Sequence, residues 1–114
     1  MFRAEGIIPA VVSPVDDEGN IREEPYRGLL NYLIDNGVHG LFINGSQGEF
    51  YALTAEEKQK VLEIAIDETK NRVPVYAGVG AVTTREAVRL ARMAEKAGAN
   101  ALSVITPYFI KPNE

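Results

Sequence analysis

Residues 73–105 read VPVYAGVGAVTTREAVRLARMAEKAGANALSVI, and this stretch decides the fold class. A short apolar run over 73–77 precedes a helical pattern over 83–97, where small and apolar residues recur at i, i+3, i+4 and i+7. A second apolar run follows at 101–105. A strand, a helix and a strand in this order predict a βαβ unit with parallel strands and a right-handed crossover.

Local signals mark the ends of the predicted helices. The pairs Thr54/Glu57 and Thr83/Glu86 each have the spacing of a capping box, in which a hydroxyl and a carboxylate satisfy amides of the first helical turn. Gly98 follows the helix over 83–97, where a left-handed cap is favoured. These signals support a regular alternation of strands and helices.

The alternation extends back to the start of the chain with a period of about 30 residues, the size of one βα unit. The strands are apolar almost throughout, which predicts that both faces of the sheet are buried. We expect strands at 6–12, 41–43, 73–77 and 101–105 and helices at 24–36, 54–70 and 83–97.

Four parallel strands and three helices fit two α/β architectures. One is an open doubly wound sheet, and the other is half of a (βα)8 barrel, since a complete barrel needs about 250 residues. Residue patterning alone leaves both open.

Composition narrows the function classes. A net charge of −4 without a block of Lys/Arg argues against nucleic-acid binding. The absence of cysteine excludes disulfide scaffolds and thiolate sites, and a single histidine excludes any site that needs two from one chain. No apolar run approaches the roughly 20 residues of a membrane span. We therefore expect a soluble, cytoplasmic protein.

The loop after the strand at 41–43 reads NGSQGE over residues 44–49 and is the most informative candidate site. Two glycines flank a hydroxyl and an amide, so successive backbone N–H groups can point at one carboxylate or phosphate. The alternative is a glycine-rich turn without a ligand. No Gly-Lys-Ser/Thr follows, which excludes a P-loop, and Thr83 replaces the third glycine of a dinucleotide fingerprint.

Several blocks in order carry a family resemblance: GIIPA at 6–10, GSQGE at 45–49, PVYAGVG at 74–80 and TPYF at 106–109. With them the chain resembles the N-terminal part of the dihydrodipicolinate synthase and N-acetylneuraminate lyase family, which are pyruvate-dependent class I aldolases. The resemblance implies that residues 1–114 are the N-terminal half of a single (βα)8 TIM barrel domain. It also implies a homo-oligomer, no cofactor or metal, and pyruvate or another 2-keto acid bound as a Schiff base to a lysine on the sixth strand.

The resemblance also assigns residues. The amides of Ser46 and Gln47 would hold the pyruvate carboxylate, the Ser46 hydroxyl would join a proton relay, and Tyr108 would form an interface or the site wall. Phe109 stands where the synthases commonly carry a second relay tyrosine, and it has no hydroxyl. A 2-keto-3-deoxy sugar acid aldolase of the same family is therefore an alternative to dihydrodipicolinate synthesis.

None of the five lysines has an obvious desolvated pocket, and a Schiff-base lysine needs one or a cationic neighbour. We interpret all five as solvated, and we expect the chain alone to be inactive: Lys58, Lys60, Lys70, Lys96 and Lys111. A companion chain could carry the remaining barrel strands. Alternatively, the chain is a non-catalytic half-barrel assembly module, because unpaired sheet edges favour association. We expect a structural role for His39, at the end of the sheet opposite the site.

Overall fold

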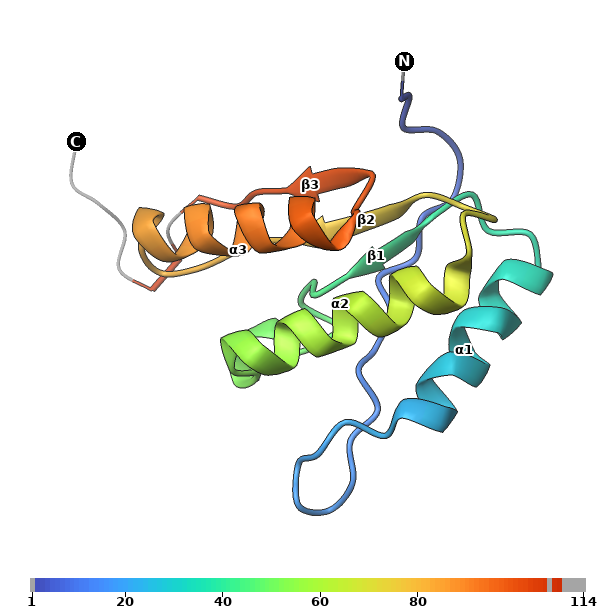
Figure 1. Ribbon diagram of the computed structural model, residues 1–114, viewed down its shortest axis with the longest axis horizontal. Helices are drawn as coiled ribbons and strands as arrows, with labels where there is room; N and C mark the ends of the chain where they lie inside the picture. The colour runs from blue at the N-terminus through green and yellow to red at the C-terminus, as the bar shows by residue number, and fades with distance from the viewer. Residues whose placement is uncertain (1, 107, 110–114) are drawn as a thin grey trace.

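The computed structural model describes residues 2–106 and 108–109. Figure 1 shows α2 lying between α1 and α3 beside the strands. The elements, in chain order, are α1 (Glu23–Asp35), β1 (Leu41–Ile43), the 3₁₀ turn η1 (Phe50–Ala52), α2 (Ala55–Thr69), β2 (Val75–Gly78), α3 (Thr84–Ala97) and β3 (Ala101–Ser103). The predicted alternation is confirmed, and the bounds of these helices and strands differ from the expected ones by at most two residues.

The three strands form one sheet in the order β1-β2-β3, and both pairs are parallel. Leu41 lies opposite Val75, and Tyr76 lies opposite Ala101. Because all three strands run the same way, their carboxyl ends meet at one edge of the sheet. That edge is where parallel α/β folds place their functional loops.

The expected strand at 6–12 is not a strand, so the prediction of four strands is wrong for the described residues. This segment does run beside β1: Val11 N donates to Phe42 O at 2.9 Å, and Phe42 N donates to Pro9 O at 2.9 Å. Only one isolated bridge results, between Ala10 and Phe42. Pro9 has no N–H, so the segment cannot continue a regular ladder.

The two predicted capping boxes differ in the structure. At α2, Glu57 N donates to Thr54 Oγ1 at 3.2 Å and Thr54 N donates to the Glu57 carboxylate at 2.8 Å, so the box is complete. At α3, Glu86 N donates to Thr83 Oγ1 at 3.2 Å, but the Glu86 carboxylate instead accepts two hydrogen bonds from Arg89. The nearby guanidinium competes for the carboxylate, and only half of the second box forms.

The core lies between the sheet and the helices, and its side chains come mainly from α1, β1, α2, β2 and α3. The fully buried apolar side chains include Tyr26, Leu30, Leu41, Ile43, Val61, Leu62, Ala65, Ala77, Val79 and Ala94.

The prediction that both sheet faces are buried is wrong for this chain. Leu41 and Ile43 are buried, whereas Phe42, on the opposite face of β1, is only half-buried. In β2, Tyr76, which lies opposite Phe42 on the same face, is also only half-buried, whereas Val75 and Ala77 are buried. The described residues bury the face that packs against the helices and leave the other face open.

Candidate anion-binding site

A small hollow of about 120 Å³ lies at the carboxyl ends of the strands. It brings together the loop after β1, the end of β2 and the end of β3. Its lining consists of Phe42, Asn44, Gly45, Ser46, Phe50, Gly78, Gly80, Ser103 and Ile105. The structure therefore places Ser46, one of the residues singled out from the sequence, at the expected edge of the sheet.

The loop after β1 folds into consecutive tight turns, in which the amides of Gly48 and Glu49 donate hydrogen bonds within the loop. Gly48 N donates to Gly45 O at 3.1 Å, and Glu49 N donates to Ser46 O at 3.0 Å. Ser46 and Gln47 are exposed, and within residues 2–106 and 108–109 their own amides donate to no backbone carbonyl of a turn or loop. Adjacent backbone N–H groups without a partner are the kind of donors that bind an anion, which makes this loop the candidate site.

Close approach of backbone segments explains two glycines at this edge. A Cβ on Gly78 would overlap the carbonyl oxygen of Asn44 and would lie 2.8 Å from its carbonyl carbon. A Cβ on Gly45 would lie 2.8 Å from the Phe42 ring. These glycines let the strand ends and the loop pack closely beside the hollow.

Aromatic rings border the hollow beyond the loop. The Phe50 ring meets the Tyr108 ring edge-on with centroids 5.7 Å apart. Tyr51 also meets Phe50 edge-on, at 5.8 Å, and is largely exposed. Phe109 is 76% exposed. Tyr108 thus lies at the rim of the hollow, where it contacts the lining residue Phe50.

Lys58 is the residue that sequence reasoning misjudged. Its Nζ lies 5.6 Å from the centroid of the Phe50 ring, and the side chain is half-buried. Burial lowers the pKa of Lys58, and the charge of Glu86 partly opposes this by raising it. The sequence feature that could have indicated an apolar neighbour for Lys58 is Phe50, directly after the glycine-rich loop. The other described lysines are exposed, as expected, and Lys111 lies outside the described residues.

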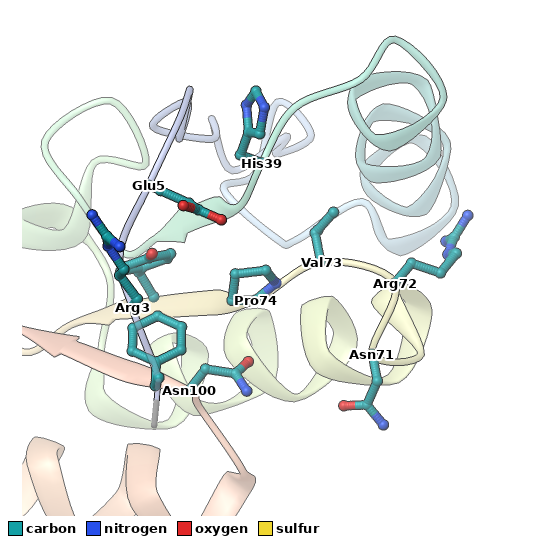
Figure 2. Close-up of a pocket in the computed structure, with 10 residues that line it drawn as sticks. Arg3, Glu5, His39, Asn71, Arg72, Val73, Pro74 and Asn100 are labelled. Carbon is teal, nitrogen blue, oxygen red and sulfur yellow. The ribbon is translucent and has the colours of Figure 1, made fainter.

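A larger hollow of about 500 Å³ lies at the opposite end of the sheet, near the starts of the strands. Figure 2 shows its side chains, with His39, Arg72 and Asn71 pointing in different directions rather than at one spot. Arg72 is engaged by Asn31 Oδ1 and by backbone carbonyls, and His39 Nδ1 accepts a hydrogen bond from Ile7 N at 2.9 Å. This bond ties the N-terminal segment to the chain before β1, which agrees with the structural role expected for His39. Since polar groups do not converge here, we place the site at the carboxyl ends.

No three His, Asp or Glu side chains of residues 2–106 and 108–109 gather as metal ligands would. No helix in this part of the chain is both long and apolar enough to cross a bilayer.

Parallel βα units, with the glycine-rich loop at the strand ends, define the chain as α/β, of the kind that builds a TIM barrel. A family model described as the dihydrodipicolinate synthetase family matches residues 3–114. The chain belongs to this family.

Individual relatives agree with this assignment. The chain is 48% identical to the 4-hydroxy-tetrahydrodipicolinate synthase of Nitrobacter hamburgensis, covering 96% of this chain and 36% of the relative. It is also similar to YagE of E. coli K12, a protein of the dihydrodipicolinic acid synthase family solved in complex with pyruvate, with a TM-score of 0.91, 41% identity, and 95% and 36% coverage. CdNal from Clostridium difficile, solved in complex with mannosamine, gives a TM-score of 0.94 with 38% identity, covering 98% of this chain and 39% of CdNal.

These matches favour the barrel over the open doubly wound sheet. The three strands and three helices match part of the structure of a dihydrodipicolinate synthase with a TM-score of 0.92. The chain spans little more than a third of the length of the curated relatives it matches, 37% of the synthase of Bartonella quintana and 38% of that of Brucella abortus.

Proposed function

We propose that this chain supplies the carboxylate-binding segment of a pyruvate-dependent, Schiff-base-forming carbon–carbon lyase or synthase. The observation that carries the proposal is the pair of exposed amides at Ser46 and Gln47, which the loop leaves without a backbone partner. A carboxylate accepts charge-assisted hydrogen bonds from two such N–H groups at once. Membership of the dihydrodipicolinate synthetase family supports a 2-keto acid as the ligand.

In this proposal each residue has a separate task. Ser46 and Gln47 hold the carboxylate of pyruvate and so orient its carbonyl carbon toward the amine that forms the imine. The Ser46 hydroxyl accepts and donates a proton during carbon–carbon bond making or breaking. Tyr108 forms the wall of the site or an interface with a neighbouring subunit. The Schiff-base lysine lies outside these 114 residues, and the chain alone is inactive.

The carboxylate assignment is tested by ¹⁵N NMR on the 114-residue chain. Pyruvate should shift the amide resonances of Ser46 and Gln47 in a saturable way. Methyl pyruvate, which keeps the ketone but has no negative charge, is the matched control and should leave both resonances in place. If pyruvate moves neither resonance, the carboxylate assignment is wrong.

The imine is tested by borohydride reduction with pyruvate, followed by the intact mass of every chain in the sample. We expect no pyruvyl adduct on this chain alone. An adduct on a companion chain would identify a barrel assembled from two chains. An adduct on this chain would contradict the proposal, and peptide mapping at the half-buried Lys58 would be the first step.

A second substrate class is favoured by Phe109, which has no hydroxyl to pass a proton. We propose as the alternative an aldolase that releases pyruvate from a 2-keto-3-deoxy sugar acid. The test is pyruvate release, coupled to lactate dehydrogenase, in a complex of this chain with one that carries the remaining strands. Activity with dihydrodipicolinate precursors and none with the sugar acid would exclude it.

A non-catalytic half-barrel module is the alternative from a different class. Its support is the edge of the sheet at β3 and just beyond, where Leu102 is 44%, Val104 69% and Ile105 44% exposed. Exposed apolar side chains along an edge strand favour association with a second copy or a companion chain. Light scattering over a dilution series tests it, and a monodisperse monomer that binds no hydrophobic dye would count against it.

A further inference from the structure

The loop at 45–49 is held at its far end by a side chain from the first segment of the chain. Ser13 Oγ donates to Gly48 O at 3.0 Å, across 35 positions of sequence, and the bond is partly buried. A Cβ on Gly48 would lie 3.1 Å from Val11 O and 3.3 Å from Ser13 Oγ, so the two segments are closely packed. The hydroxyl of Ser13 thus fixes the loop just after Gln47.

The near end of the loop is held by Asn44. This residue is only 3% exposed, and its φ of 59° lies in the left-handed region that asparagine tolerates better than most residues. Its Nδ2 donates to Lys58 O of α2 at 3.0 Å. The loop therefore begins from a residue that is tied to the first turns of a capped helix.

Asn44 also retains an unused acceptor. Its Oδ1 is buried and, among the described residues, has no hydrogen-bond partner. A buried acceptor without a partner lowers the stability of the fold, so Asn44 occupies this position at a cost in free energy. Two features of Asn44 offset this cost: its bond to Lys58 O and its left-handed backbone conformation at the start of the loop.

We propose that Ser13 and Asn44 are positioning residues that hold the amides of Ser46 and Gln47 aimed at one carboxylate. The inference rests on the proposed function, because it assigns these two residues to the same anion site. Neither residue touches the ligand. Their two bonds restrict a surface loop to the conformation that binds, so the free protein needs no further ordering of this loop on binding.

Loss of either bond lets the loop visit conformations in which the two amides diverge. The apparent dissociation constant for pyruvate then equals the intrinsic constant divided by the fraction of molecules whose loop is in the binding conformation. One net hydrogen bond corresponds to a change of about two- to tenfold in that equilibrium. We therefore expect S13A and N44G each to weaken pyruvate binding by about two- to tenfold.

The variants have matched controls within the chain. S13T keeps the hydroxyl and should restore wild-type affinity. N71G removes another asparagine with a φ of 59°, an exposed one outside the loop, and controls for the loss of a left-handed asparagine. N44D keeps the shape and the φ but replaces the donating amide by a carboxylate oxygen, and should bind as weakly as N44G.

The experiment is a pyruvate titration followed by the ¹⁵N resonances of Ser46 and Gln47, at a temperature where each variant is fully folded. A merely structural role would lower the unfolding midpoint and leave the dissociation constant of the folded chain unchanged. S13A and N44G binding pyruvate as tightly as wild type would overturn the inference, as would equal weakening by N71G. If wild type itself shows no shift, the proposed function fails instead, and the two failures are distinguished.

Discussion

The close approach of β2 to the loop after β1 predicts that alanine at Gly78 destabilises the chain, whereas alanine at the uncrowded Gly28 stabilises it. Gly78 has no room for a side chain, because a Cβ would overlap the Asn44 carbonyl oxygen and would lie 3.2 Å from Ile43 O. Both atoms belong to backbone and cannot rotate away. Overpacking of this kind costs about 1–3 kcal/mol, and replacing glycine lowers the entropy of the unfolded chain, which returns about 0.4–1 kcal/mol. We expect G78A to destabilise the chain by about 1–2 kcal/mol.

Gly28 is the matched control. It lies inside α1, and a Cβ there would meet no atom within 4 Å. Glycine in a helix interior is about 0.8–1.0 kcal/mol less favourable than alanine, so G28A should stabilise by about that amount. Urea unfolding followed by far-UV circular dichroism, at one chain concentration, measures both. A G78A midpoint at or above that of wild type would refute the close approach at the strand ends.

Three further predictions concern the helices. The hydrogen bond from the Arg27 guanidinium lowers the pKa of Glu68 below its ordinary value of 4.5. The ionised Glu68 therefore stabilises the folded chain above that value, and this stabilisation is lost as the pH falls through the folded pKa. E68Q should make the free energy of unfolding less dependent on pH in acid, and an unchanged acid slope would contradict this. Burial lowers the pKa of Lys58 and the charge of Glu86 raises it, so E86Q should lower the Nζ titration midpoint of Lys58 seen by NMR further, and a rise would show that the two groups are not coupled as described. T54A removes the hydroxyl that caps α2 and should cost about 1 kcal/mol in thermal or urea unfolding, with T54S, which keeps the hydroxyl, close to wild type.

Much of the fold could be predicted because its signals are local. The capping box at Thr54 and the glycine at Gly98, whose φ is +97°, set helix ends within a turn of sequence. The parallel pairing followed from helices long enough to cross between strands. The position of the loop at 45–49 followed from the same alternation, since a loop after a parallel strand can only lie at its carboxyl end.

Other features could not be predicted, because they depend on partners far away in sequence. The segment before Ser13 has the composition of a strand, and only its placement against β1 showed that Pro9 interrupts the ladder. Lys58 occupies a helix position that the sequence pattern predicts to be exposed, and only the structure shows that it is half-buried with its Nζ near the Phe50 ring. The bond from Ser13 to Gly48 links positions 35 residues apart.

The sequence by itself determined the order of strands and helices, the helix ends, the family and the loop that carries Ser46 and Gln47. These properties depend on backbone preferences and hydrophobic periodicity, which act over a few residues. Only the tertiary structure decided that, among the described residues, the amides of Ser46 and Gln47 have no backbone partner in a turn or loop. It also decided that Ser13 and Asn44 bond to Gly48 and Lys58, and that one face of the sheet is only partly covered. Those outcomes depend on which distant atoms meet, and side-chain hydrogen bonds and burial are set by that packing.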